Sequence, residues 1–173
     1  MSEEQKIFLG LGSNKGDRYK NLKKGIDLLN NHPHIWVTDQ SYIYQSPAMY
    51  QTDQDDFYNM VVTIDTNLIP VDLLREIKNI EIKSGRILET KKNMPRILDI
   101  DILAIGDMQI QSETLEIPHS RISERKFVLK PWSDIASGFT LPNSSKTVSD
   151  LLESTADYSE VRMVLILDKE GMI

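Results

Sequence analysis

Two aspartates, Asp99 and Asp101, are the residues whose type and spacing most clearly suggest chemistry. They alternate with apolar residues in the run Ile97–Ile105, which has the composition of a buried strand. Because residues two apart on a strand point to the same face, the two carboxylates should project side by side. Both faces of the run are otherwise apolar, so we expect a central strand. Two like charges there are costly without a cation, and paired carboxylates with phosphate oxygens commonly hold Mg²⁺.

The same pair of aspartates has two plainer interpretations. They could form ion pairs with nearby arginines, or they could face water at the mouth of a strand. Most pairs with this spacing are incidental, so the motif by itself does not establish a metal site. The surrounding residues have to decide.

Basic residues near the pair favour phosphate chemistry. They are Arg86, Arg96, His119, Arg121 and Arg125. The planar guanidinium fork suits phosphate oxygens, and phosphoryl-type transfer depends on positioning and charge neutralisation more than on a covalent nucleophile. Exposed arginine is common, so a solvated surface remains an alternative.

Glu81 lies on a predicted helix that begins at Pro70 and ends before Gly85. It follows Ile77 by four residues, so it sits at the edge of the apolar stripe and should face the sheet. A carboxylate there needs a partner. Taken alone, an ion pair between helix and strand is the favoured interpretation.

The glycines in Gly10–Asn14 invite comparison with nucleotide-binding loops. A dinucleotide fingerprint would need glycine where the chain has Lys15, and no Gly-Lys-Ser/Thr sequence occurs. We therefore expect these glycines to serve a turn or close backbone packing.

Asn59 and Phe57 fall on one face of a predicted strand. An amide suits the donor and acceptor edge of a heterocycle, and an aromatic ring suits its flat surface. Without further context, polar edge filling explains Asn59 equally well. Phe127 is similarly open between a core residue and a platform for a ligand.

The elements that must position these residues follow from hydrophobic periodicity and from turn signals. The predicted order is a strand at Ile7–Leu11, a helix capped by Asp17, strands at Trp36–Ser46 and Phe57–Thr66, the helix from Pro70, the strand Ile97–Ile105, a hairpin at Met108–Ile117, a helix at Val148–Leu152 and a strand at Met163–Leu167. The first six elements read β-α-β-β-α-β, which predicts an α+β ferredoxin-like antiparallel sheet with a C-terminal extension. Two helices should cover one face and leave the other free for a ligand.

Composition narrows the class of protein. The chain has 173 residues, which suits a single domain spanning 1–173, and it contains no cysteine. A net charge of −6 argues against a general nucleic-acid binder. The start lacks a signal peptide, and no run approaches the ~20 apolar residues that span a bilayer. We expect a cytoplasmic protein with no nucleic-acid or membrane partner.

Several segments together resemble the 6-hydroxymethyl-7,8-dihydropterin pyrophosphokinase family of folate biosynthesis. They are Leu9–Asn14, Phe57–Asn59, Ile80–Arg86, Pro95–Leu103 and Pro118–Phe127. The segment Pro-Arg-x-Leu-Asp-x-Asp-Ile-Leu is the specific signature, and the resemblance covers roughly the first 140 residues. It implies a ferredoxin-like fold and transfer of pyrophosphate from Mg·ATP to the pterin alcohol, with AMP as the second product.

The resemblance also assigns roles to residues. It places two Mg²⁺ ions on Asp99 and Asp101. It assigns catalytic roles to these two aspartates and to Arg86 and Arg96. The ATP-binding residues are Glu81, Ile102, His119 and Arg125, and the pterin-binding residues are Ser46, Pro47, Met49, Phe57, Asn59 and Phe127. The loop before Pro95 would close over the reactants.

The chain departs from the family pattern in three loops. Leu88 replaces a second arginine, Asn93-Met94 replaces Trp-Gly, and Ala48-Met49-Tyr50 replaces a segment with proline and glycine. These differences bear on loop closure, affinity and rate more than on reaction type.

Two other functions compete with this one. A non-catalytic ferredoxin-like ligand-binding domain would explain the element order but not the aspartates among arginines. A divalent-metal phosphodiesterase would use paired carboxylates and would hydrolyse ATP without a pterin acceptor. We expect a monomer.

Overall fold

The computed structural model describes residues 6–49, 53–85, 94–164, 167–168 and 171–172. Its strands are β1 (Ile7–Ser13), β2 (Ile35–Gln40), β3 (Tyr44–Ser46), β4 (Phe57–Thr66), β5 (Asp99–Ile105), β6 (Ile110–Gln111), β7 (Glu116–Ile117), β8 (Arg162–Met163), β9 (Leu167–Asp168) and β10 (Gly171–Met172). Its helices are α1 (Arg18–Asn30), α2 (Pro70–Lys83), α3 (Lys126–Ala136) and α4 (Val148–Ser154), with a 3₁₀ turn at Ile122–Glu124. None of these helices is long and apolar enough to cross a membrane.

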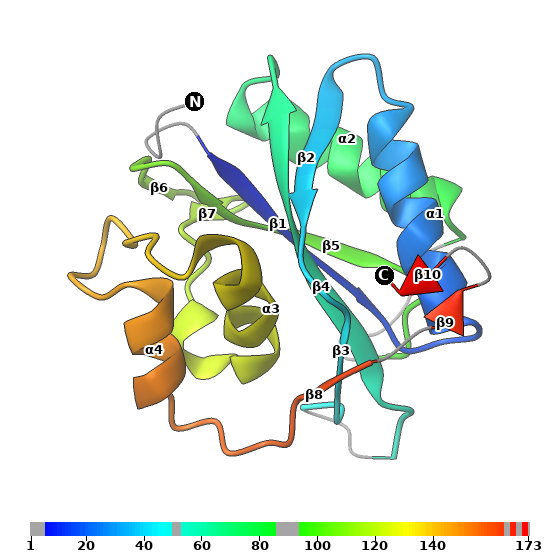
Figure 1. Ribbon diagram of the computed structural model, residues 1–173. Helices are drawn as coiled ribbons and strands as arrows, with labels where there is room; N and C mark the ends of the chain where they lie inside the picture. The colour runs from blue at the N-terminus through cyan, green and yellow to red at the C-terminus, as the bar shows by residue number, and fades with distance from the viewer. Residues whose placement is uncertain (1–5, 50–52, 86–93, 165–166, 169–170, 173) are drawn as a thin grey trace.

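The main sheet is antiparallel and, within the described residues, has six strands. Its order is β5-β1-β4-β3-β8, and β2 pairs with the other half of β4 (Figure 1). The predicted single strand Trp36–Ser46 is therefore two strands. Between them the Ser41 hydroxyl accepts a hydrogen bond from the backbone N–H of Val61 at 2.9 Å, which interrupts the ladder.

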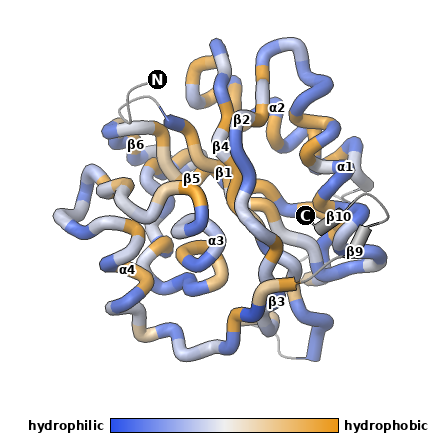
Figure 2. Tube along the Cα trace, in the orientation of Figure 1, coloured by the Kyte–Doolittle hydropathy of each residue, from blue (hydrophilic) through white to orange (hydrophobic). Residues whose placement is uncertain are grey.

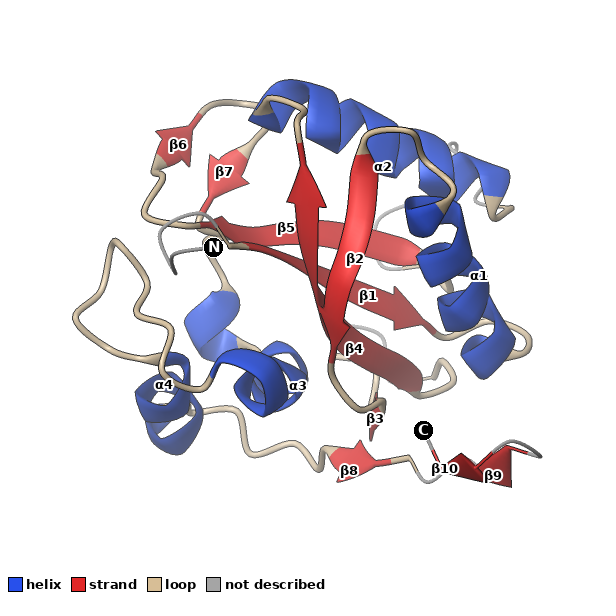
Figure 3. Ribbon diagram, turned by 45° about the horizontal axis from the view of Figure 1, so that its top comes forward, coloured by secondary structure: helices blue, strands red, loops and turns tan. Residues whose placement is uncertain are grey.

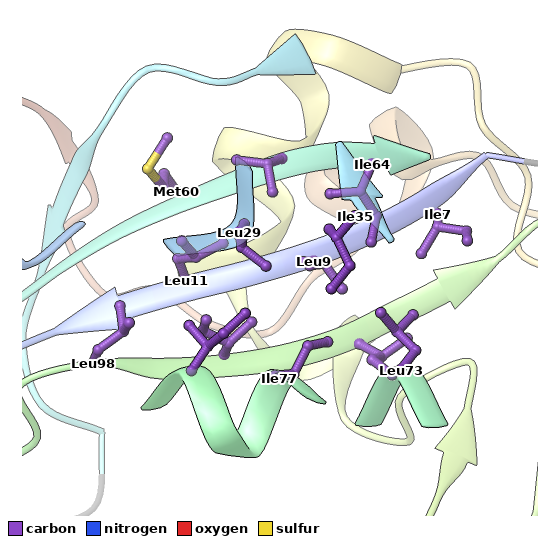
Figure 4. Packing of buried hydrophobic residues seen from close by; sticks show 14 of the residues in the cluster. Ile7, Leu9, Leu11, Leu29, Ile35, Met60, Ile64, Leu73, Ile77 and Leu98 are labelled. Atoms are coloured by element: carbon purple, nitrogen blue, oxygen red, sulfur yellow. The ribbon is translucent and has the colours of Figure 1, made fainter. Parts of the chain in front are cut away.

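Helices α1 and α2 cover one face of the sheet, as predicted (Figure 3). Asp17 caps α1 by accepting from the Lys20 N–H at 3.1 Å, and Pro70 occupies the first turn of α2. Figure 4 shows Leu73 and Ile77 of α2 pointing toward the sheet, where they meet the apolar residues of β1 and β5. Full burial of each such side chain contributes about 1.5–3 kcal/mol.

Helices α3 and α4 pack on the second face. Phe8 of β1 and Val61 of β4 join Trp132 of α3 and Leu151 of α4 in a separate buried cluster. The prediction that helices cover one face only is therefore wrong. Among the described residues, this face is hollowed toward the end of the sheet where Asn59 and Phe57 lie.

Strand β5 is an edge strand, not the predicted central strand, because β1 is its single neighbour in the described part of the chain. The residues on both faces of β5 are mostly apolar because helices cover both faces. A register shift in the β1–β5 pairing also places Ala104 in the same cluster as Leu103, although strict alternation would separate them. Figure 2 shows the apolar stretches along β1 and β5.

The remaining predictions at the C-terminal end agree in part with the structure. Strands β6 and β7 form the predicted hairpin, and α4 matches the helix predicted at Val148–Leu152. The predicted last strand Met163–Leu167 overlaps only the ends of β8 and β9. Helix α3 was not predicted.

Candidate active site

The floor of the site is a set of short side chains on three adjacent strands. On β1, Gly12 lies opposite Asp99 of β5 and Asn59 of β4, while Gly10 lies opposite Asp101. A Cβ added to Gly12 would lie 3.2 Å from Asn59 Oδ1, closer than nearly all such contacts. A Cβ added to Gly10 would lie 3.3 Å from Leu103 Cδ2. Both glycines therefore let neighbouring side chains approach the backbone closely, which is the role expected for them, and both line the open space beside these strands.

A cavity of about 280 Å³ occupies this space. It brings together eleven of the fourteen predicted site residues: Ser46, Pro47, Met49, Phe57, Asn59, Arg96, Asp99, Asp101, His119, Arg125 and Phe127. Residues from distant parts of the sequence therefore share one pocket, with carboxylates and basic groups toward β5 and an amide and rings toward β4.

The two aspartates have different partners. Arg96 lies 2.6 Å from Asp99 Oδ1, and both side chains are about a quarter exposed. Arg125 lies 4.0 Å from Asp101 Oδ2, a distant pair whose carboxylate is 37% exposed. The Nε–H of Arg125 is buried and has no hydrogen-bond partner among the described residues. Asp101 and Arg125 therefore retain bonding capacity toward a ligand.

The electrostatics of the pair favour a bound cation. Burial raises the pKa of the Asp101 carboxyl, and the charge of Asp99 raises it further. Burial has the opposite effect on a cationic group and lowers the pKa of His119, although the negative charge of Asp101 opposes that shift. A divalent cation would relieve the repulsion between the aspartates. Within the described residues no three His, Cys, Asp or Glu side chains cluster as a metal site, so phosphate oxygens or water would complete the coordination of Mg²⁺.

The amide side of the cavity is held by a buried hydrogen bond. Asn59 Nδ2 donates to Ser46 Oγ at 2.8 Å, and both residues are almost fully buried. Phe57 and Phe127 line the same cavity, and the Arg125 guanidinium lies 5.8 Å from the Phe127 ring centre. The orientation of the Asn59 amide is therefore fixed before any ligand arrives.

Asn14, whose side chain is buried, joins two walls of the cavity, and sequence reasoning missed it. Its Oδ1 accepts from the Arg96 N–H at 2.7 Å, and its Nδ2 donates to Gln54 Oε1 at 3.0 Å. Both Arg96 and Gln54 line the cavity. The sequence feature that could have indicated this role is the asparagine directly after Gly12-Ser13. Its hydrogen-bond partners, however, lie tens of residues away in the sequence.

The sequence model of the family described as 7,8-dihydro-6-hydroxymethylpterin-pyrophosphokinase (HPPK) matches residues 8–137. The chain belongs to this family. A similar relative is the 2-amino-4-hydroxy-6-hydroxymethyldihydropteridine pyrophosphokinase of Methylorubrum extorquens. It is 42% identical over 131 residues, which are 76% of this chain and 82% of the relative.

Other HPPK relatives are longer. The folic acid synthesis protein FOL1 of Dictyostelium discoideum is 43% identical over 136 residues, 79% of this chain but 20% of that protein. A crystal structure of Plasmodium falciparum HPPK-DHPS with pterin and p-hydroxybenzoate matches with a TM-score of 0.72 at 16% identity. The match covers 100% of this chain and 48% of that one. This structural likeness shows the fold. The chain spans less than a quarter of the length of FOL1 and about half of the length of the Plasmodium falciparum chain.

Of the three other predicted site residues of this HPPK-family chain, Ile102 and Glu81 do not line the cavity. The third, Arg86, lies outside the described residues, as do Leu88, Asn93 and Tyr50 among the loop departures. Ile102 is buried in the first core cluster. Glu81 is 1% exposed and faces β5, as predicted.

Glu81 fastens α2 to the outer edge of β5. Its Oε1 accepts from the backbone N–H of Ile100 at 2.7 Å and from Lys78 Nζ at 3.0 Å. Lys78 Nζ in turn donates to the Ile100 carbonyl at 3.1 Å. Burial raises the pKa of Glu81, while the Lys78 charge opposes the shift. The expected ion pair between helix and strand takes a different form: the ion pair is with Lys78 of the same helix, and the contact with the strand is a hydrogen bond to the Ile100 backbone. Together these bonds position the strand that carries both aspartates.

Proposed function

We propose that the chain transfers pyrophosphate from Mg·ATP to 6-hydroxymethyl-7,8-dihydropterin, giving AMP and the pterin diphosphate in folate biosynthesis. The observation that carries this proposal is the single cavity that joins Asn59 and two phenylalanines to Asp99, Asp101 and three basic residues. One end suits a flat heterocycle with a hydrogen-bonding edge, and the other suits a triphosphate. Membership of the HPPK family supports the same reaction.

The finer classification of the fold is part of this proposal. We infer a ferredoxin-like core made of β1, α1, β2, β4, α2 and β5. The strand order β5-β1-β4-β2, with every neighbouring pair antiparallel, supports it.

Asp99 and Asp101 are the proposed ligands of two Mg²⁺ ions. Both carboxylates line the cavity, and the pKa of Asp101 is raised first by burial and then by the charge of Asp99, so a cation beside the pair would be stabilising. When bound, Mg²⁺ would supply positive charge against the oxygens of the triphosphate. The carboxylates hold that charge at the β5 end of the cavity.

Basic residues would complete the phosphate site. Arg96, His119 and Arg125 line the cavity, and the Nε–H of Arg125, which has no hydrogen-bond partner in the described part of the chain, suits a phosphate oxygen. Arg86 is proposed for the same role from its sequence position. Ile102 follows Ile100 by two residues on the edge of β5, so its backbone is a candidate contact for adenine, with Glu81 lining that side.

The pterin would occupy the other end. Asn59, held by Ser46, would read the heterocycle edge, and the ring would lie between Phe57 and Phe127. Pro47 and Met49 complete this part of the lining.

In the proposed reaction, the hydroxymethyl oxygen of the pterin attacks the β-phosphorus. A bond forms between that oxygen and the β-phosphorus, and the bond from the β-phosphorus to the α–β bridging oxygen breaks. The bridging oxygen leaves with AMP, and the hydroxyl proton passes to solvent or to a base. Arg96 and Arg125 would orient the phosphates for this in-line exchange.

One assay tests the proposal. AMP release is measured from Mg·ATP with 6-hydroxymethyl-7,8-dihydropterin and in a control without pterin. We expect AMP only when the pterin is present. ATP hydrolysis without pterin would indicate a phosphodiesterase. Nucleotide binding that does not depend on Mg²⁺, with no AMP under either condition, would indicate a non-catalytic binding domain.

A further inference from the structure

The first turn of α3 is capped by a residue far along the chain. Arg125, which precedes the helix, makes no side-chain capping bond. Instead, Asp157 Oδ2 accepts from the Lys126 N–H at 3.0 Å. A carboxylate at a helix N-terminus satisfies an otherwise unpaired donor and interacts favourably with the helix dipole.

This cap acts on Arg125 and Phe127, two of the residues at the start of α3 that line the cavity; Val128 lines it as well. Lys126 lies directly between Arg125 and Phe127, so fixing its backbone fixes the directions in which both neighbours leave the chain. Arg125 contributes its guanidinium near Asp101, and Phe127 contributes a ring to the amide side. The start of α3 therefore sets the relative position of the two halves of the site.

The segment that carries Asp157 is itself held in place. Asp157 Oδ1 accepts from the Ser159 N–H at 2.9 Å, so both carboxylate oxygens are used. Lys126 Nζ donates to the Ser159 carbonyl at 3.1 Å. Thr155 Oγ1 donates to the Ser123 carbonyl at 2.9 Å, in the 3₁₀ turn before α3.

The same segment continues to the opposite wall of the pocket. From α4 the chain runs past α3 to β8, which pairs with β3 (Figure 1). Met163 lies opposite Tyr44, and β3 ends at Ser46, the partner of Asn59. The C-terminal segment thus connects the start of α3 with the strand that leads into the amide pocket.

We propose that Asp157 is a positioning residue of the active site, which holds Arg125 and Phe127 in their binding positions through the first turn of α3. Asp157 lies beyond residues 8–137, the part matched by the family model. The proposal rests on the proposed function for its choice of pterin and ATP as ligands.

The first experiment compares Asp157→Ala and Asp157→Asn with the wild type. The Asp157→Asn variant keeps one acceptor oxygen, so it should retain part of the function that Asp157→Ala loses. Its NH₂ group replaces the other oxygen and cannot accept the second hydrogen bond. Glu153→Ala removes an exposed carboxylate from α4 and is the matched control. Folding is checked by circular dichroism and thermal midpoint before binding is measured.

Affinity is measured by titrating 6-hydroxymethyl-7,8-dihydropterin in the presence of Mg²⁺ and a non-hydrolysable ATP analogue. For Asp157→Ala we expect the pterin Kd to rise roughly five- to tenfold, the size of a lost helix cap transmitted to binding. Asp157→Asn should fall between Asp157→Ala and the wild type, and Glu153→Ala should match the wild type. A folded Asp157→Ala protein with wild-type affinity would overturn the proposal.

A double-mutant cycle with Phe127→Ala separates positioning from general destabilisation. If Asp157 acts through the start of α3, Asp157→Ala should have little further effect on pterin Kd once the Phe127 ring is gone. Fully additive effects would contradict the positioning role. The wild-type protein separates this proposal from the proposed reaction. If it binds pterin but releases no AMP, the proposed reaction is wrong, and the double-mutant cycle still tests the role of Asp157 in pterin binding.

Discussion

Asn14 and Arg96 are joined by two backbone-directed hydrogen bonds in opposite directions. Asn14 N–H donates to the Arg96 carbonyl at 3.0 Å, and Asn14 Oδ1 accepts from the Arg96 N–H at 2.7 Å. Asn14, which directly follows β1, thus sets the backbone of the arginine that pairs with Asp99.

Asn14→Ala should therefore impair both stability and catalysis. The substitution removes the hydrogen bonds of a buried amide to part-buried partners, so we expect a loss of about 1–3 kcal/mol in the free energy of unfolding. The value of kcat should also fall, because Arg96 is less well positioned. Denaturant unfolding and AMP release measure the two effects, with the exposed Asn143→Ala as control. Unchanged kcat would separate Asn14 from the positioning of Arg96.

Asp101→Ala should nearly abolish transfer while the protein stays folded. Loss of a proposed metal ligand should lower turnover roughly a thousandfold or more. Stability without Mg²⁺ should hold or rise, since the raised pKa of Asp101 marks an unfavourable charge in the folded state. Asp107→Ala, in the exposed turn after β5, is the control. An Asp101 variant that retains most of its turnover would remove this residue from the mechanism.

Asn59→Ala should chiefly weaken pterin binding. Removing a buried amide that meets a heterocycle edge should raise the pterin KM by about 10- to 100-fold, with little change in the KM for ATP. Steady-state kinetics with each substrate varied in turn measures the split, and the exposed Asn67→Ala serves as control. The assignment fails if pterin affinity is unaltered.

Gly12→Ala should have a related effect through shape alone. The new methyl group would lie 3.2 Å from Asn59 Oδ1 and 3.6 Å from the Phe57 ring, so Asn59 must move. We expect a several-fold rise in the pterin Kd. Gly138→Ala adds the same methyl group where nothing lies within 4 Å, and it should leave binding unchanged. Equal effects of the two substitutions would contradict this view of the cavity floor.

The cap at α3 should make stability depend on pH. Burial raises the pKa of Asp157, but hydrogen bonds from Ser159 and Lys126 outweigh it, so the pKa lies below its ordinary value. A pKa lowered by folding contributes stability above the unfolded pKa, which is lost as the pH falls through the folded pKa. The difference in unfolding free energy between wild type and Asp157→Ala should thus be largest near neutral pH and shrink below about pH 4. A difference independent of pH would show that the charge is not involved.

Local signals predicted much of the fold. Asp17 and Pro70 mark helix starts through side chains next to the helices they begin, and the alternation in Phe57–Thr66 placed Val61 and Met60 on opposite faces correctly. These features depend on neighbours within a few residues, which a sequence displays directly.

The failures share a long-range cause. Helix α3 has no local cap and contains Pro131, and its cap comes from Asp157, 31 residues later. Strand β5 looked central because apolar residues fill both of its faces, yet side chains of α2, not a second strand, hold part of its outer edge. For the site, the sequence and family resemblance named most of the cavity lining, but the bonds of Asn14 depend on folded contacts.

The contact of Glu81 and Lys78 with Ile100 also bears on association between molecules. An exposed sheet edge offers open N–H and C=O groups to a strand from another chain. Here the carboxylate takes the donor of Ile100 and the ammonium takes its acceptor. A second molecule therefore cannot extend the sheet at Ile100 without displacing the ion pair between the buried Glu81 and the partly exposed Lys78. At Ile100, one residue before Asp101, the strand that carries both aspartates is thereby shielded from edge-to-edge association.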